Sequence, residues 1–408
     1  MAVSIIEALN IIDEKIKSIT ATEFIDIEDS LGRVIANDII SKVNLPKFDN
    51  SAMDGYAVNS SLLGQIVKTQ KEVIYAGNKT LPILKDKYAI RIMTGAPVPE
   101  NADIVVPIEM IEFIGDDIKI PSDFKKGANI RLKGEELKSG NVCIKKGEEI
   151  NSYSITLLAS QGIDKIEVFK KPLVTIFGSG DELKHYSQKN ISEFQIYNSN
   201  TPMLKARAKS LNCETMSINN TLDNLESLKE VISNSLNSDF IITTGGASVG
   251  DKDLTKEAFI ELGMQYLFEK IDIKPGKPTS LGIIENTYIL ILPGNPTAAM
   301  INFELFGKFI INKLKNLAKP YHFTIKTKIS NELKLKSGKH SVILGYFNGD
   351  SFMPLPNQSP NYLSILKDAN SLIITKPEID YLQKNQDINI LMIEDIFLDN
   401  TTEDIFVF

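Results

Sequence analysis

The chain has 408 residues, of which 43% are hydrophobic and 24% charged, and its formal net charge at pH 7 is −7. A single hydrophobic core stops growing at roughly 250 to 300 residues, so this length predicts two to four domains. The negative charge argues against a nucleic-acid-binding surface, and no apolar run approaches the roughly 20 residues of a membrane span.

The N-terminal part of the chain predicts a helix, a strand and then a β-rich module. Ser4 and Glu7 make a capping-box pattern, and the apolar residues behind them recur at three-four spacing, which predicts a first helix. A strand follows near 24–27 and a short helical stretch near 31–36. From 45 to 140, short segments are broken by prolines, which predicts an inserted, mostly β domain rich in proline and glycine.

After this module, helices and strands alternate. The pattern places helices at 153–158, 202–211, 222–236, 254–262 and 297–317, and strands at 173–177, 214–218, 240–243 and 288–292. Such alternation makes right-handed βαβ units and a wound sheet. We therefore predict a doubly wound three-layer α/β domain over 173–320.

The last part of the chain predicts strands without helices. They fall at 323–329, 341–347, 371–375 and 388–393. These strands could form a small barrel or a sandwich, and we predict a small C-terminal β-barrel over 321–408, a normal size for a domain. The segments 1–44 and 141–172 would form an elongated N-terminal domain around the inserted module. The fold class is thus multidomain, α/β plus β.

The N-terminus and the cysteines indicate the cytoplasm. Met1 to Ile5 lack the basic region and apolar core of a signal peptide. The two cysteines, Cys143 and Cys213, stand far apart and outside any metal or redox motif, so we expect reduced thiols. These features predict a cytoplasmic protein.

Three turns rich in glycine or proline follow hydrophobic, strand-like segments. They are Thr243–Asp253, Lys274–Pro278 and Pro293–Pro296. Ligands of an open parallel sheet bind outside the carboxyl ends of its strands, so we expect the three turns to converge. Bare backbone amides, two lysines and two aspartates suit a phosphate-bearing ligand with a metal ion. The first turn lacks the Walker A and Rossmann spacings, and alone it could equally be a tight connection.

The charged residues of these turns each allow two interpretations. Asp251 and Asp253 could cap the next helix, bind a divalent cation, or do both. Glu182, at a strand-to-helix turn, could aim a carboxylate into the same crevice or lie in solvent. Lys274 and Lys277 could pair with phosphate or be ordinary surface lysines. The three scattered histidines argue against a histidine metal site or a catalytic triad.

The β-rich module has three segments that are dense in small polar residues. They are 49–57, 91–99 and 129–136. As plain structure they would be turns, but their content of Asp, Asn, Ser and Thr exceeds what turns require. The sequence therefore places polar clusters on two separate domains.

In these segments the chain resembles the molybdopterin molybdenumtransferases, the MoeA-type family that includes the C-terminal part of gephyrin. The motifs that carry the resemblance are Asp49–Ala57, Arg91–Pro99, Asn129–Glu136, Gly178–Leu183, Thr243–Asp253 with Thr255-Lys256, Ile273–Pro278 and Leu292–Pro296. They occur in the family's order, and an ordered set is far more specific than any single motif.

The resemblance implies insertion of molybdate into adenylylated molybdopterin with release of AMP, dependent on Mg²⁺. It implies an elongated homodimer whose site lies between the α/β domain of one subunit and the module of the other. By this likeness the catalytic residues are Asp54, Thr94, Glu182 and Asp253, with Glu182 and Asp253 as metal ligands. The implied substrate-binding residues are Ser51, Arg131, Thr243, Gly245, Gly246, Ser248, Gly250, Lys274, Lys277, Pro293 and Asn295.

Three departures from the family pattern bear on this site. Glu136 stands where the family has Asp, which keeps the charge and lengthens the arm. Asn219-Asn220-Thr221 stands where many members have an acidic pair. In the tail, the segment 358–361 only partly follows the family's glycine-containing version.

Three alternatives stand beside the metal-inserting transferase. The adenylyltransferase that prepares its substrate shares only the α/β domain, whereas Asp54 and Thr94 lie on an additional module. A scaffold of the gephyrin type is the weaker expectation, because this sequence begins at its first helix without a second α/β domain before it. The departures at Glu136 and Thr221 leave a catalytically silent, cofactor-binding relative open.

Overall fold

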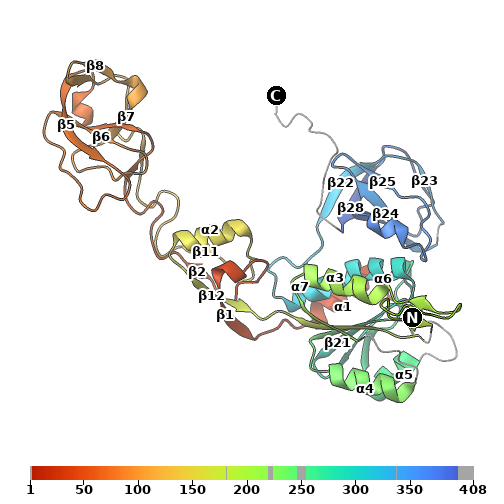
Figure 1. The fold of residues 1–408 in the computed structure, drawn as a ribbon. Helices are drawn as coiled ribbons and strands as arrows, with labels where there is room; N and C mark the ends of the chain where they lie inside the picture. The colour runs from red at the N-terminus through yellow and green to blue at the C-terminus, as the bar shows by residue number, and fades with distance from the viewer. Residues whose placement is uncertain (1, 181, 219–223, 246–253, 337, 394–408) are drawn as a thin grey trace.

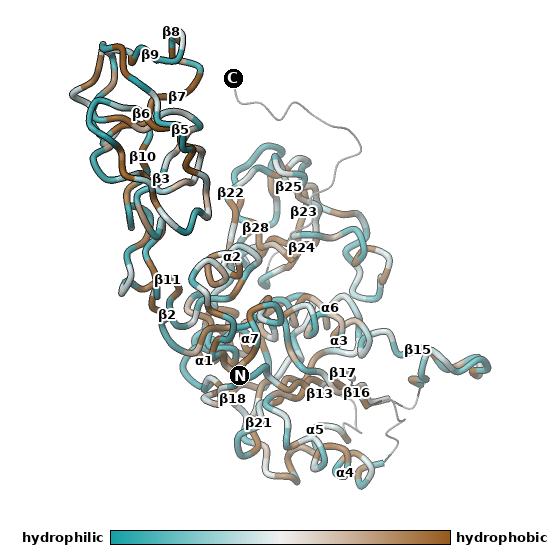
Figure 2. The backbone as a smooth tube through the Cα atoms, turned by 60° about the vertical axis from the view of Figure 1, so that its left-hand side comes forward, coloured by the Kyte–Doolittle hydropathy of each residue, from teal (hydrophilic) through white to brown (hydrophobic). Residues whose placement is uncertain are grey.

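The computed structural model describes residues 2–180, 182–218, 224–245, 254–336 and 338–393. Figure 1 shows a β-rich module at one end of the molecule, a stalk, and an α/β domain beside a small barrel. The same separation of module and α/β domain is visible in the turned view of Figure 2. Within the described ranges, none of the helices combines the length and the apolarity that crossing a membrane requires.

The first helix, α1 (Ile5–Lys15), begins with the expected capping box. Ser4 Oγ accepts the Glu7 N–H, and the Glu7 carboxylate accepts the Ser4 N–H at 2.7 Å. Its buried residues, Ile5, Ala8 and Ile12, belong to the same apolar core as the α/β sheet. The helix therefore packs on the α/β domain, although it precedes the stalk in the chain.

The stalk pairs the segment before the module with the segment after it. Its antiparallel pairs are β1 (Thr22–Asp26) with β12 (Lys165–Phe169) and β2 (Ile39–Ile40) with β11 (Val142–Ile144). Helix α2 (Ser152–Ser160) lies beside them and is capped by Asn151, which confirms the helix expected there. The domain limits given above stay a prediction.

The short helix expected near 31–36 is wrong. The structure has a single 3₁₀ turn, η1 (Ile27–Asp29), and then Val34 and Ile35 form β-bridges to Glu149 and Val168. Both residues are buried, and β-branched side chains fit such pairing well. Long-range pairing has therefore overridden the local helical pattern.

The module is a curled six-stranded sheet, in the order β7-β4-β6-β5-β9-β8. Its strands are β4 (Gly55–Val58), β5 (Ile66–Ile74), β6 (Tyr88–Ile92), β7 (Ile104–Pro107), β8 (Glu112–Ile114) and β9 (Asp117–Lys119). A short ladder of β3 (Asn50–Ser51) and β10 (Ile130–Arg131) lies apart from it. Two apolar clusters hold the module together, and its described helical pieces are the 3₁₀ turns η2 (Ser60–Leu62) and η3 (Ile108–Met110). The mostly β prediction is confirmed.

The α/β domain has a six-stranded sheet with helices on both faces, as predicted. The strand order is β16 (Glu214–Ile218), β13 (Leu173–Gly178), β17 (Phe240–Thr244), β21 (Thr287–Leu292), β20 (Ser280–Ile284) and β18 (Gln265–Phe268). One face carries α1, α3 (Asn200–Ser210), α6 (Pro296–Asn302) and α7 (Lys308–Leu314), and the other carries α4 (Leu225–Ser235) and α5 (Leu254–Glu261). Figure 1 shows these two helical layers around the sheet.

Two features of this domain differ from the prediction. The first four strands of the sheet are parallel, but β20 and β18 are antiparallel additions that the sequence reading missed. The single long helix expected at 297–317 is instead α6, a π-helical turn η4 (Phe303–Gly307) and α7. Within that turn the fully buried Glu304 pairs with Arg207 of α3, at 2.7 Å between Nε and Oε1.

The C-terminal region is a closed five-stranded barrel, which confirms the prediction. Its strands run in the order β24 (His340–Phe347), β25 (Ser351–Pro354), β22 (Thr324–Ile329), β28 (Asp387–Met392) and β26 (Ser371–Thr375), and β26 pairs back with β24. An apolar cluster that includes Phe352 and Ile390 fills the interior. A two-residue strand from the α/β region, β19 (Ile273–Lys274), adds to β24 and ties the barrel to that domain.

Candidate functional site

Two of the three glycine- or proline-rich turns leave the α/β sheet side by side. Strands β17 and β21 are parallel neighbours, with Thr244 opposite Leu292, so the turns at Gly245 and Pro293 begin at one edge. Gly245 has φ +88°, and a Cβ there would lie 2.1 Å from the Ser179 carbonyl oxygen. Only glycine fits this close approach of two strand ends. The expected convergence of these two turns is confirmed.

The lysine turn Lys274–Pro278 reaches the same edge by a different route. We expected this turn to follow a strand of the parallel sheet, and that expectation is wrong. The strand before it, β19, pairs with the barrel. The turn precedes the antiparallel strand β20 instead, and Ser280 at the start of β20 lies opposite Ile291 near the carboxyl end of β21. Lys274 and Lys277 are both exposed. The turn therefore arrives at the expected place from the opposite strand direction.

Glu182 lies at the neighbouring strand end with a free carboxylate. The Ser179 N–H donates to the Thr244 carbonyl at 2.9 Å, which joins the end of β13 to that of β17. Glu182 precedes a strand pair, β14 (Leu183–Lys184) with β15 (Ile196–Tyr197), and not a helix as expected. Its side chain is exposed, and the described part of the chain offers its carboxylate no hydrogen-bond donor or cation. The carboxylate is therefore available to a ligand.

Thr243 is less accessible than its predicted role requires. Its side chain is fully buried on the sheet face covered by α4 and α5, in register with Ile291 and Ser280. Among the described residues, neither the Thr243 nor the Ser280 hydroxyl has a hydrogen-bond partner. A ligand at the exposed edge would meet the backbone beyond Thr243 before it met this hydroxyl.

Two polar residues at this edge were not found from the sequence. The Asn200 side chain donates to the Gly294 carbonyl at 2.7 Å and so fixes the third turn. Thr297 donates its N–H to the Pro360 carbonyl and its hydroxyl to the Tyr362 carbonyl. These contacts bring the tail segment that departs from the family pattern to the rim of the site. Pro293 is buried, whereas Asn295 is exposed at the start of α6.

The three polar segments of the module meet at one corner. Ser51 lies opposite Ile130 in the short ladder, and its backbone exchanges hydrogen bonds with Gly95 and Ala96. Arg131 is exposed at the other position of that ladder. Segments 49–57, 91–99 and 129–136 thus come together, as their composition suggested, but Ser51 is fully buried and its hydroxyl donates to the Met53 carbonyl, so this predicted substrate-binding residue is not exposed to a ligand.

Asp54 and Thr94 form the centre of this corner. The Thr94 N–H and hydroxyl both donate to the same oxygen of Asp54, Oδ1, at 2.7 Å each. These two bonds, first the backbone one, hold the pKa of the Asp54 carboxyl below its usual range, and the charge of Arg91 adds to them. No donor among the described residues reaches Oδ2. Asp54 is therefore ionised, oriented and open on one oxygen.

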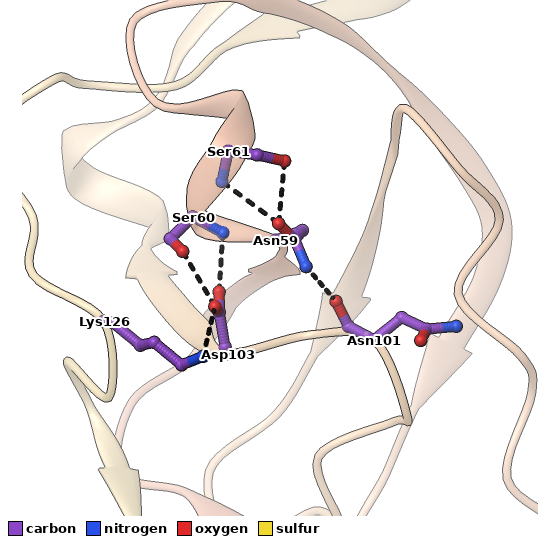
Figure 3. A network of polar contacts seen from close by, with 6 residues as sticks. All are labelled: Asn59, Ser60, Ser61, Asn101, Asp103 and Lys126. Carbon is purple, nitrogen blue, oxygen red and sulfur yellow. Dashed lines mark hydrogen bonds and ion pairs between the residues drawn. The ribbon is translucent and has the colours of Figure 1, made fainter.

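The same module has a second aspartate with similar partners at the far end of β4. Figure 3 shows Asp103 accepting the N–H and the hydroxyl of Ser60, with Lys126 beside it. The Ser60 hydroxyl donates to Oδ2 at 2.7 Å, and the Lys126 ammonium lies 3.6 Å from that oxygen. Each oxygen of Asp103 thus has at least one protein partner, and this network joins η2 to the residue that precedes β7.

Several predicted residues lie outside the described residues. They are Gly246, Ser248, Gly250 and Asp253 of the first turn, together with Thr221 of the acidic-pair position. Glu136 is exposed and donates its backbone N–H to Leu45. The described residues contain no group of three or more His, Cys, Asp or Glu side chains that could hold a metal ion without help from a ligand.

Comparison with known proteins gives matches over most of the chain. Residues 3–162 match the family described as MoeA N-terminal region (domain I and II), and residues 175–313 match a probable molybdopterin binding domain. A molybdopterin molybdenumtransferase from Haemophilus influenzae is 38% identical over 311 residues, 75% of this chain and 76% of that protein. Another from Staphylococcus aureus is 37% identical over 290 residues, 69% of each. A solved molybdopterin biosynthesis moeA protein from Pyrococcus horikoshii superposes with a TM-score of 0.84 at 25% identity, covering 96% of this chain and 100% of that one.

Proposed function

The chain belongs to the molybdopterin molybdenumtransferase family, whose members act in molybdenum cofactor biosynthesis, and we propose that it inserts molybdate into adenylylated molybdopterin and releases AMP. One observation carries this proposal. Two open carboxylates, Asp54 and Glu182, stand on two separate polar surfaces of an elongated chain. Each surface alone is incomplete for a reaction that joins an oxyanion to a pterin nucleotide.

The α/β edge supplies the anion-binding part of the proposed site. Gly294 is exposed and lets a ligand approach the backbone without side-chain obstruction, and Lys274 and Lys277 offer two exposed cations. Molybdate and the phosphates of an adenylylated substrate are both oxyanions, so one lysine-bearing turn suits either. We propose that the turn Lys274–Pro278 binds molybdate or phosphate.

The donor set at this edge also fits Mg²⁺. This ion binds one or two carboxylates and completes its coordination shell with phosphate oxygens and water. One free carboxylate, that of Glu182, is therefore enough as the ligand from the described residues. Glu182 would hold the ion together with Asp253, which lies outside the described residues. The bound ion would neutralise charge on the phosphoanhydride.

Asp54 has a different role in this proposal. Its depressed pKa makes it a weak proton acceptor near neutral pH, so general-base catalysis is not its best use. Its open oxygen can instead accept a hydrogen bond from the attacking water or the protonated oxyanion. Attack of a molybdate oxygen or of water on the pterin-side phosphorus would form a new P–O bond there and break the bridging P–O bond of the anhydride, so that AMP leaves with the bridging oxygen. Thr94 fixes the direction in which Asp54 points.

The site would be shared between two subunits of a homodimer. Figures 1 and 2 show the module held away from the α/β domain by the stalk, so one chain does not bring its own two surfaces together. A second copy arranged with two-fold symmetry would close both sites at once. We place this reaction in the cytoplasm, in keeping with two free cysteines in the described part of the chain.

An assay of AMP release tests the proposed reaction. Purified protein is incubated with adenylylated molybdopterin and Mg²⁺, with and without molybdate. We expect AMP only when molybdate is present. Failure of molybdate to stimulate AMP release would overturn the proposal. The non-catalytic scaffold is not favoured, because the relatives matched over most of the chain are named as transferases.

Mixing two inactive variants tests the shared site. Asp54→Ala and Glu182→Ala subunits would each be inactive, because they remove one half of every site. After subunit exchange, half of the dimers are mixed, and each mixed dimer rebuilds one of its two sites. We expect about a quarter of the wild-type activity to return. If each site lay within one subunit, mixing would restore nothing.

A further inference from the structure

We propose that Asn302 is a positioning residue that holds the lysine turn, Lys274–Pro278, at the edge of the α/β sheet. This inference rests on the proposed function, because it concerns the placement of two substrate-binding lysines. Asn302 is the last residue of α6 and is fully buried, so it does not itself reach the site.

The side chain of Asn302 joins the helix to the turn. Its Nδ2 donates to the Ala298 carbonyl at 2.7 Å, within α6, and to the Pro275 carbonyl at 3.3 Å, within the lysine turn. Both acceptors are carbonyl oxygens, so the amide can stand in only this orientation. Its Oδ1 is buried and has no partner among the described residues. A buried amide with an unpaired oxygen is costly, so its presence favours a role for the two bonds that its nitrogen donates.

The turn has no room to move on its Asn302 side. Gly276 has φ +115°, and a Cβ on it would lie 1.8 Å from Asn302 Nδ2. The backbone between the two lysines therefore rests directly on the amide group. A larger residue at 276 would push the turn away from α6.

The other supports of the turn close it upon itself or hold its ends. Ile271 donates its N–H to the Lys277 carbonyl, and Thr279 donates its N–H and its hydroxyl to the Gly276 carbonyl. These bonds close the turn upon itself. Strand β19 anchors the first residues of the turn to the barrel. The Asn302 side chain joins the turn to α6 by its hydrogen bond to Pro275. Strands β19 and β20 hold the two ends of the turn, and Asn302 holds its middle against α6.

Asn302→Ser separates the two hydrogen bonds. A serine hydroxyl can still donate to the carbonyl four residues earlier, at Ala298, but it is too short to reach Pro275. We expect the KM for molybdate to rise about tenfold while kcat changes less than about twofold, because the lysines bind substrate and transition state alike. We also expect faster hydrogen exchange at the Ile271 and Thr279 amides.

Asn312→Ser is the matched control. Asn312 lies in α7, on the same helical rod, and its side chain donates to another proline carbonyl, that of Pro320, at 2.9 Å. It shares the chemistry and the burial but not the turn. We expect this variant to leave both the KM for molybdate and the exchange of the 271–279 segment unchanged.

A third variant tests whether the rise in KM depends on the contact between Asn302 and Gly276. Gly276→Ala should raise KM in the same way, and combining it with Asn302→Ser should be no worse than the more severe single change. Unchanged exchange and unchanged KM in Asn302→Ser would overturn the inference while the proposed reaction stood. Absence of molybdate-dependent activity in the wild type would overturn the reaction, and the exchange measurement would still decide the role of Asn302.

Discussion

The module holds two aspartates with the same kind of partner, and they stand at opposite ends of β4. Asp54 takes the N–H and the hydroxyl of Thr94, and Asp103 takes the N–H and the hydroxyl of Ser60. The difference lies in how the oxygens are used. Asp54 receives both bonds on one oxygen and keeps the other open, whereas Asp103 spreads its bonds over both oxygens and adds Lys126.

This comparison teaches how to tell a functional carboxylate from a structural one. Residue type and local pattern are nearly the same in the two corners, so neither separates them. The use of the two oxygens separates them: Asp54 keeps one oxygen that accepts no bond from the described residues, whereas each oxygen of Asp103 already accepts at least one. We therefore expect Asp54 to control activity and Asp103 to control the stability of the module.

The largest expected effect is on activity, in Asp54→Asn. The amide keeps the shape of the side chain and can still accept from Thr94, but it loses the charge. We expect molybdate-dependent AMP release to fall by about 100-fold or more, as when an oriented electrostatic group is removed from other active sites. The thermal unfolding of the module should be nearly unchanged.

The matched control is Asp103→Asn, which alters the same chemistry at the far end of β4. It should retain wild-type kcat and KM. If Asp103→Asn lost activity as Asp54→Asn does, the functional distinction between the corners would be wrong. Steady-state AMP release at saturating molybdate decides between these results.

The next effect is on stability, in Asp103→Ala. This change removes the acceptor for the Ser60 N–H and hydroxyl, and it leaves that backbone group without its partner. Hydrogen bonds to charged groups contribute about 1.5 to 3 kcal/mol, so we expect the module to lose about 2 kcal/mol of its free energy of unfolding. Because the chain has several domains, hydrogen exchange of the β4 and β7 amides is the suitable measure.

Asp54→Ala sets the opposite limit in that measurement. The partner of the Asp54 carboxylate, Thr94, is exposed. Water can therefore accept the hydrogen bonds of Thr94 when the carboxylate is removed. We expect exchange in β4 to change far less than in Asp103→Ala. Equal protection in the two variants would show that open oxygens do not distinguish the corners.

The Asp54 corner also shows which features could be predicted from the sequence. Asp54 and Thr94 were expected to act at one site, and the structure joins these two residues by two hydrogen bonds. The wound sheet and the barrel were predicted from hydrophobic periodicity alone. Such patterns are local, so they survive without knowledge of the rest of the chain.

What the sequence missed depends on contacts between distant segments. Strand β20 continues the sheet as an antiparallel hairpin with β21, and no strand was predicted at 280–284. Asn200 and Asn302 read as ordinary helix residues until Gly294 and Pro275 are placed beside them. The helix expected near 31–36 failed for the same reason, since Val34 and Ile35 bridge to residues more than a hundred positions away.

A smaller effect is expected on pH dependence, in Thr94→Val. The hydroxyl bond to Asp54 is lost and the backbone bond remains. Removing a donor from the charged form raises the pKa of Asp54 toward its ordinary value. The acid limb of the activity profile should therefore move to higher pH, and activity at neutral pH should fall about tenfold because the carboxylate is less well oriented.

Ser60→Ala is the counterpart of that variant in the other corner. It removes the corresponding hydroxyl from Asp103 and should leave the pH profile unchanged. A profile for Thr94→Val that superposes on the wild type would mean that Asp54 does not set the acid limb. Rates of AMP release between about pH 2.5 and 7 span the ordinary aspartate pKa of about 3.9 and the lower values expected for Asp54, and they test both variants.

The smallest effect is expected from Lys126→Met, which removes only the ion pair of the Asp103 corner. The Lys126 ammonium lies 3.6 Å from Asp103 Oδ2, and the lysine side chain is 79% exposed. Water screens such a pair, so the module should lose less than about 1 kcal/mol, and less still at high salt. Exchange of the β4 and β7 amides in low and high salt measures this loss. If Lys126→Met destabilised the module as much as Asp103→Ala, the ion pair, and not the two bonds to Ser60, would hold this corner together.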